Sequence, residues 1–142
     1  MASISLNDAR QIIHGTFAKG QELNLRPLAV VVLDDGGHPI AFERQNGCSP
    51  GRFKVAEGKA YGCVMMGMGG EAFSRRAETH AHFVLALNGA YDGKLVPVPG
   101  GILVRSKAGE VVGAIGVTGD TSENDAAAGR AGVEAAGLIA ET

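Results

Sequence analysis

The chain has 142 residues, of which 45% are hydrophobic and 20% are charged, and its formal net charge is −2. This length predicts one domain with one core over residues 1–142. Aromatic residues make up only 5% and no basic stripe is visible, so we expect no nucleic-acid partner. No apolar run has the length of a membrane-spanning helix and residues 1–5 do not resemble a signal peptide, so we expect no membrane partner and a cytoplasmic location.

The first half of the chain predicts a helix, a hairpin and a second helix. Ser5 precedes an apolar stripe that predicts a helix ending near residues 20–24. Two apolar runs flank the turn over residues 34–37, which predicts a β-hairpin over 28–45. Ser49 and Pro50 are a typical start for the next helix, which reaches residue 67. Two glycines inside that helix, Gly58 and Gly62, indicate that another segment packs closely against it.

The second half predicts two more helices around a second hairpin. A helix is expected over residues 71–88, and the proline-containing stretch 95–101 is expected to be irregular. The second hairpin spans 102–117, and a final helix rich in alanine and glycine runs from 122 to about 139. Two hairpins between helices predict an α/β (α+β) domain with a mostly antiparallel sheet flanked by helices.

Several residue types that often bind metals do not form a metal site by spacing. Cys48 and Cys63 lack a metal-type spacing and are expected to be free thiols. His80 and His82 diverge on a helix because they are two residues apart. The methionines Met65, Met66 and Met68 spread around their helix, which favours packing in the core or at a subunit interface. We therefore expect no metal site, while the particular role of these histidines and methionines stays open.

A set of short motifs in a characteristic order resembles one protein family. The motifs occupy residues 28–30, 35–38, 41–44, 58–60, 99–101 and 109–119, followed by Asp125. In this order and spacing they resemble the GlcG/HbpS-like family, also called the haem-degrading or DUF336 family. The resemblance implies a profilin-like α/β fold and assembly into dimers or larger oligomers. Some members are linked to haem or iron, and others to the catabolism of small hydroxy acids, diols or aromatic compounds.

Three cation-capable residues are the candidate site residues. His14, at the edge of the first apolar stripe, could ligate iron or move a proton. The resemblance adds that one branch, a domain attached to corrinoid adenosyltransferases, binds haem through a histidine on the corresponding helix. Arg44 suits binding of a substrate carboxylate, although an ion pair with a surface acid such as Glu57 would explain it equally. Lys59 could bind an anion or act as an acid or base, or it could merely cover apolar surface with its stem.

Three functions follow from these residues and the resemblance. The first is a small-molecule-binding protein of a catabolic pathway, an isomerase, lyase or hydrolase acting on a small carboxylate or oxygenated compound. His14 and Lys59 would be catalytic there, and Arg44 and Lys59 would bind the substrate. The second is a haem- or iron-binding module for sensing, storage or haem degradation, with haem as the candidate cofactor at His14. The third is a non-catalytic oligomeric interaction protein.

The ligand and the assembly can also be predicted. We expect a small anionic ligand between the first hairpin and the second helix, near His14, Arg44 and Lys59. The small-residue final helix and the methionine-rich second helix offer faces for self-association, so we expect a dimer or a larger even-numbered oligomer.

Overall fold

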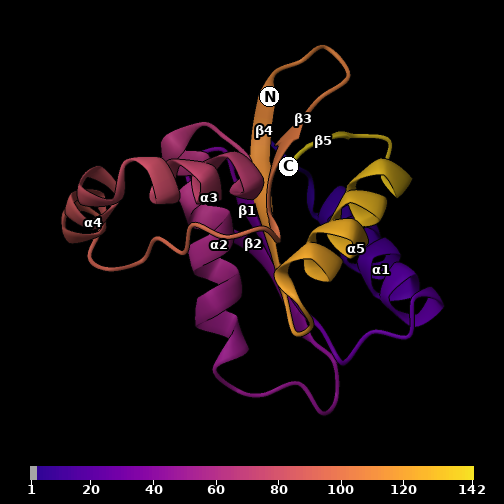
Figure 1. Ribbon diagram of the computed structural model, residues 1–142. Helices are drawn as coiled ribbons and strands as arrows, with labels where there is room; N and C mark the ends of the chain where they lie inside the picture. The colour runs from indigo at the N-terminus through magenta and orange to yellow at the C-terminus, as the bar shows by residue number, and fades with distance from the viewer. Residues whose placement is uncertain (1–2) are drawn as a thin grey trace.

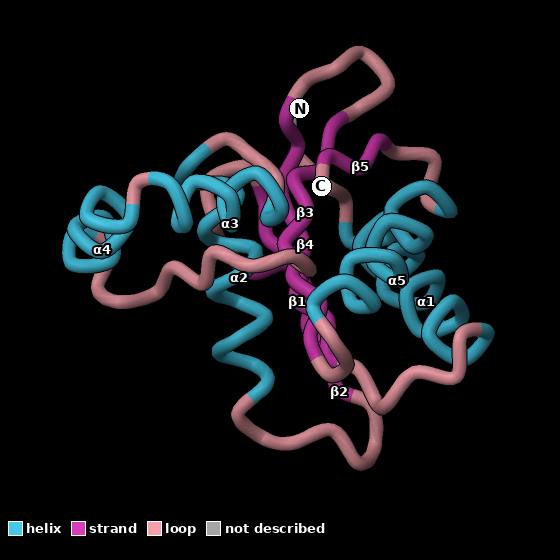
Figure 2. Tube along the Cα trace, in the orientation of Figure 1, coloured by secondary structure: helices cyan, strands magenta, loops and turns pink. Residues whose placement is uncertain are grey.

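A computed structural model describes residues 3–142, which fold into five helices and one five-stranded sheet (Figures 1 and 2). The elements follow one another as α1 Leu6–Glu22, β1 Ala29–Asp34, β2 Pro39–Arg44, α2 Arg52–Met66, α3 Gly70–Thr79, α4 Ala81–Ala90, β3 Gly101–Arg105, β4 Val111–Thr118, α5 Ser122–Ala135 and β5 Ile139–Glu141. The predicted α+β class, with an antiparallel sheet flanked by helices, is confirmed.

The sheet has the strand order β2-β1-β4-β3-β5, and every neighbouring pair is antiparallel. Both predicted hairpins are present, as the pairs β1–β2 and β3–β4. The hairpins join through β1 and β4, where Ala29 pairs with Thr118 and Asp34 pairs with Gly113. These two central strands are almost continuously apolar, because helices cover the sheet on both faces.

Alternation along the strands divides the core into two clusters on opposite faces of the sheet. Val30 and Val32 of β1 point toward α1 and α5, where they pack with Ile12 and Val133. Their neighbours in the strand, such as Val31, point toward α2 and pack against it. Figure 1 shows this arrangement, with α1 and α5 on one side of the sheet and α2, α3 and α4 on the other. A side chain of α1 and a side chain of α2 are therefore separated by the sheet.

The expected close packing at the glycines of α2 is confirmed. A Cβ on Gly58 would meet Val96, and a Cβ on Gly62 would lie 3.0 Å from the Phe73 ring. Phe73 forms a third small cluster with Val84 and Leu95, which attaches α3 and α4 to the body. The absence of side chains at these two positions is what lets the segment after α4 and the Phe73 ring approach the helix axis.

Three predicted element boundaries are wrong. The helix expected over 71–88 is two helices, because the backbone turns at His80 (φ −135°, ψ 55°). This bend allows Val84 of α4 to pack near Phe73 of α3. The final helix ends at Ala135, and Gly137 (φ 77°) redirects the chain into β5, which pairs with β3. The second helix begins after Gly51 rather than at Pro50.

Candidate functional site

A shallow groove lies between α1 and the end of β2, and we call it the α1–β2 groove. Its volume is about 540 Å³, and it is lined by Phe17, Gln21, Leu25, Pro27, Glu43, Arg44, Gln45 and Asn46. Three of these residues are apolar, and the predicted site residue Arg44 contributes a positive charge. Arg44 is exposed, and within residues 3–142 it forms no salt bridge, so its guanidinium is available to a ligand.

His14 lies on the side of α1 that leads to this groove. It is exposed, one turn before Phe17 and two turns before Gln21, and both of those residues line the groove. Residues spaced three and seven apart share one face of a helix. Arg44 therefore lines the groove, whereas His14 lies beside it. The opposite side of α1 is buried against α5 and the sheet.

Lys59 occupies a different environment, in the interior of the protein. It is 3% exposed, its Nζ donates to the Val117 carbonyl oxygen at 2.9 Å, and it lies 3.3 Å from Asp125 Oδ2. Asp125 is 1% exposed and also accepts from the backbone N–H of Asp120 at 2.9 Å. Burial lowers the pKa of Lys59, and the carboxylate of Asp125 opposes this change. Burial likewise raises the pKa of Asp125 while Lys59 opposes it, so each charge depends on the other.

The expectation that His14, Arg44 and Lys59 surround one pocket is therefore not met. Lys59 sits on α2, on the other side of the sheet from α1, and among residues 3–142 the helices α1 and α2 do not touch. Nor does Lys59 simply cover apolar surface with its stem, since its charge is paired in the interior. The sequence marked Asp125 as a family position, but it carried no signal that Asp125 pairs with a lysine on a distant helix.

A second concave region, which we call the Arg52 hollow, adjoins the groove at Pro27. Its volume is about 190 Å³, and its lining consists of Arg26, Pro27, Gly47, Cys48, Ser49, Arg52 and Gly119. It lies between the loop that follows the first hairpin and the start of α2, in the region where the sequence predicts a small anionic ligand. Its two arginines were not among the predicted site residues. In the sequence, the position of Arg52 in the first turn of a helix was the feature that could have indicated its role.

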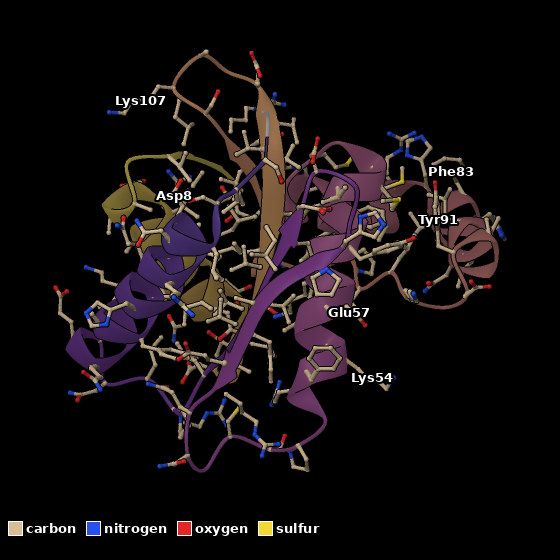
Figure 3. The ribbon with its side chains drawn as sticks, turned by 180° about the vertical axis from the view of Figure 1, so that it is seen from behind. Asp8, Lys54, Glu57, Phe83, Tyr91 and Lys107 are labelled. Atoms are coloured by element: carbon tan, nitrogen blue, oxygen red, sulfur yellow. The ribbon has the colours of Figure 1, made fainter. Side chains whose placement is uncertain are left out.

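A third hollow of about 370 Å³ separates α2 from the segment after α4. It is lined by Lys54, Val55, Glu57, Asp92, Gly93, Lys94 and Val96. Figure 3 shows Lys54 and Glu57 on α2 and Phe83 and Tyr91 at α4. Its lining carries charges of both signs and no histidine, cysteine or methionine. It therefore offers neither a haem-iron ligand nor a uniform charge for an anion.

The other metal-capable side chains stay apart in the described part of the chain. Met65 packs near Gly37, whereas Met66 and Met68 belong to the cluster around Phe73. His80 Nδ1 lies 2.8 Å from Thr79 Oγ1, and His82 is exposed on α4. Within residues 3–142 no three His, Cys, Asp or Glu side chains converge on a metal position. Helices of membrane-spanning length and apolarity are likewise missing from the same residues.

Comparison with known proteins identifies the family. The family model described as "Haem degrading protein HbpS-like" matches residues 4–134. This chain belongs to the HbpS-like family. Among curated relatives, an uncharacterized 15.0 kDa protein in the dhaT-dhaS intergenic region of Citrobacter freundii is 27% identical over 125 residues, covering 88% of this chain and 86% of that protein.

Solved structures share the fold of this HbpS-like chain at lower identity. The PduOC–haem complex superposes with a TM-score of 0.86 at 21% identity, covering 99% of both chains. The Klebsiella pneumoniae protein ORFY, a DUF336 protein, gives a TM-score of 0.84 at 21% identity over 94% of this chain and 90% of ORFY. HbpS itself gives 0.78 at 22% identity over 93% and 89%. The profilin-like arrangement expected from the resemblance is therefore the fold of this chain.

Proposed function

We propose that this HbpS-like protein binds haem in the α1–β2 groove. The observation that carries the proposal is a combination of three features: apolar lining residues, an arginine that forms no salt bridge within residues 3–142, and a histidine one helical turn before Phe17. Haem is a flat apolar ring system with two carboxylate groups, and its iron takes an imidazole nitrogen as an axial ligand. The groove would supply partners for the ring and the carboxylates, and His14 beside it would supply the imidazole.

The residues present fit haem in kind. Phe17, Leu25 and Pro27 would contact the ring, and Arg44 would hold a propionate through charge-assisted hydrogen bonds. His14 would be the axial ligand, because none of the groove's own lining residues is a histidine, methionine, cysteine or tyrosine. Bound haem would supply an iron centre able to bind small ligands or change its redox state. The two propionates of haem would give the ligand the anionic character that the sequence predicts.

Two comparisons support the choice of haem. The family description names haem degradation, and one structural neighbour is a complex with haem. At 21% identity that neighbour supports the fold and the plausibility of the ligand class, whereas the residues that would hold haem here are inferred from this chain alone.

The catabolic-enzyme interpretation draws less support from the geometry. It assigned acid–base work to Lys59, yet the Lys59 ammonium is buried, paired with Asp125 and absent from the lining of the three hollows described above. A general acid or base must come within hydrogen-bond reach of its substrate. Turnover of a small carboxylate stays a prediction, and it would depend on His14 and Arg44 rather than on Lys59.

Haem titration of the purified apoprotein tests the proposal. Addition of haemin should shift and sharpen the Soret band at a stoichiometry of one haem per groove. His14→Ala should remove the spectral signature of the axial imidazole. Arg44→Ala should weaken binding about tenfold, the effect of losing one charge-assisted hydrogen bond. His38→Ala is the matched control, because His38 is exposed in the β1–β2 turn, beside Asp34 and outside the lining of the groove.

Two results would count against haem in this groove. One is an unchanged Soret band on mixing haemin with the parent protein. The other is a Soret shift that His14→Ala and His38→Ala both leave intact, which would move the axial ligand elsewhere. Thermal unfolding of each variant separates a lost site from a lost fold, since His14 and Arg44 are both exposed.

A further inference from the structure

The Arg52 hollow carries more positive charge than its surroundings neutralise. Arg52 is partly buried, and its Nη1 donates to the Thr118 hydroxyl at 2.8 Å. Within residues 3–142 no carboxylate forms a salt bridge with Arg52. A hydroxyl group can fix the position of a guanidinium without cancelling its charge. The structure thus holds an arginine in place and leaves its remaining N–H donors to another partner.

Arg26 adds a second guanidinium to the lining of the same hollow. Its Nε lies 3.6 Å from Asp120 Oδ2, and its side chain is 70% exposed. Asp120 is already engaged, since it accepts from Arg26 N at 2.9 Å, Thr121 N at 2.9 Å and Asn124 Nδ2 at 2.8 Å. These hydrogen bonds, that of Asn124 first, hold the pKa of Asp120 well below its usual range. Asp120 therefore belongs to the loop before α5, and among residues 3–142 it forms a salt bridge with Arg26 but not with Arg52.

The backbone around the hollow adds to this positive potential. Gly51 precedes α2 and gives the helix no side-chain cap, and the first turn of α2 contains no acidic residue. Ser49 and Arg52 of the lining flank this helix start. An uncapped helix N-terminus presents backbone N–H groups and a partial positive charge. Burial raises the pKa of the Cys48 thiol in this lining; the charges of Arg52 and Arg44 lower it, and the charge of Asp125, which is paired with Lys59, raises it.

The volume of the hollow limits the size of an anion that could neutralise the positive charge of its arginines. About 190 Å³ holds a group of a few heavy atoms but is too small for a tetrapyrrole or a nucleotide. Gly119 (φ 143°) forms part of the wall, and a Cβ there would collide with the Pro27 carbonyl oxygen. At Gly119 and Pro27 the wall is therefore backbone packed on backbone, which restricts movement of this part of the hollow.

We propose that the Arg52 hollow binds a small oxyanion, a carboxylate or a phosphate group, between the guanidinium groups of Arg52 and Arg26. Arginine binds either group through two parallel N–H···O bonds, and the fixed guanidinium of Arg52 loses little freedom in doing so. Pro27 lines both this hollow and the groove, but the binding groups differ: the anion would bind to Arg52 and Arg26, whereas the haem proposal uses His14 and Arg44. It gives the protein a second position for a small anionic metabolite or for an acidic group on a larger molecule.

Calorimetric titration with inorganic phosphate and, separately, with lactate tests the site at low ionic strength, with chloride as the reference anion. The parent protein should bind at least one of the two more tightly than chloride. Arg52→Gln should weaken that binding at least tenfold, and Arg26→Gln should weaken it by a smaller factor because Arg26 is shared with Asp120. Arg75→Gln is the matched control, since Arg75 is exposed on α3 and should leave binding unchanged.

Each outcome has a definite meaning. Binding of phosphate alone identifies a phosphate site, binding of lactate alone identifies a carboxylate site, and binding of both identifies a general oxyanion site. Binding no tighter than that of chloride, or equal binding by Arg52→Gln and Arg75→Gln, overturns the proposal. If Arg52→Gln does not fold, Arg26→Gln carries the test, because its side chain is mostly exposed. The His14→Ala protein should bind the anion like the parent even if the haem proposal fails.

Discussion

Lys59 and Asp125 are the two charged side chains most deeply buried in the described part of the chain. Their pairing connects the middle of α2 with the first turn of α5, past the end of β4. Removing one partner of a buried pair leaves the other charge without compensation, and that loss is larger than the net contribution of the intact pair. The pair therefore makes the junction of these three elements sensitive to single substitutions.

Lys59→Met should destabilise the protein by about 3–5 kcal/mol, because the carboxylate of Asp125 would stay buried without its counterion. Urea unfolding followed by circular dichroism measures the change. Lys54→Met is the matched control, since Lys54 lies on the exposed side of the same helix and should shift the free energy of unfolding by less than about 0.5 kcal/mol. Equal stability of the two variants would show that the pair has no structural role.

The two cysteines should differ sharply in reactivity. Cys63 is fully buried, and burial raises the pKa of its thiol to about 12. Cys48 is partly exposed in the loop before α2. Because the thiolate is the reactive form, iodoacetamide at pH 8 should alkylate Cys48 in the native protein and reach Cys63 only after denaturation. Peptide mass spectrometry identifies the alkylated cysteines. Rapid labelling of Cys63 in the native protein would contradict the structure.

The sequence predicted the position of only some of the site residues. Arginine chemistry pointed to Arg44, and the position of Arg44 at the end of β2 does place it on a groove. Helical spacing cannot reveal that Lys59 faces Asp125, because the two residues meet only after α2 and α5 have packed around the end of β4. Arg52 was missed for the same reason, since Thr118, its fixed partner, lies far along the chain.

Among the elements, α1 and α5 depend on glycine for their close approach. A Cβ on Gly132 of α5 would meet Thr16 Oγ1 and the Ile12 carbonyl oxygen of α1, with Thr16 N at 2.8 Å. Gly15 of α1 lies opposite, where a Cβ would be 3.1 Å from Gly132 Cα. The small residues of α5 thus pack against α1 within one chain. Self-association through the remaining small residues of α5, such as the exposed Ala127, stays a prediction.

Gly132→Ala should therefore destabilise the protein by about 1–3 kcal/mol, as overpacking does when backbone atoms must move. Gly89→Ala on α4 is the control, because nothing lies within 4 Å of a Cβ there. Alanine is the better helix former, so Gly89→Ala should be neutral or should stabilise by up to about 1 kcal/mol. Differential scanning calorimetry would report the opposite signs, and two shifts of the same sign would refute the packing argument.

Elements with strong local signals were predicted well, and those defined by tertiary contacts were not. Both hairpins could be predicted from their turns, one over residues 34–37 and one after Arg105. The residue types in these turns favour turns wherever they occur. No glycine or proline lies at His80, so the sequence did not predict the bend there. Strand β5 is three residues long and is a strand only because β3 offers it a free edge.

At the scale of the whole molecule, α4 is the helix with the fewest buried residues. Val84 is its one buried residue, while Phe83 is 43% exposed and Leu85 is 71% exposed. Figure 1 shows the helix standing away from the sheet. Large apolar side chains exposed on a projecting helix are typical of an interface. The self-association that the sequence predicts from other faces would therefore be better served by this one.

We expect light scattering at micromolar concentration to give a mass of at least twice the 14.5 kDa of one chain. Leu85→Glu should lower that mass by placing a charge in the apolar contact, whereas Lys107→Glu in the β3–β4 turn should leave it unchanged. A mass of one chain for the parent protein would remove the prediction of an oligomer. An oligomer that survives Leu85→Glu would place its interface on another surface.

The strand order has a consequence for how the protein is made. The centre of the sheet joins β1 to β4, and β2, three helices and β3 lie between these two strands in the chain. As the chain leaves the ribosome, the apolar run Ala29–Leu33 of the first hairpin stays unpaired on its β4 side until β4 has been translated. Pairing across so long a stretch costs loop-closure entropy before any core contact repays it, and this slows folding. Synthesis of this protein therefore includes a long interval in which its most aggregation-prone strand is exposed, and factors that hold nascent apolar segments should determine its yield.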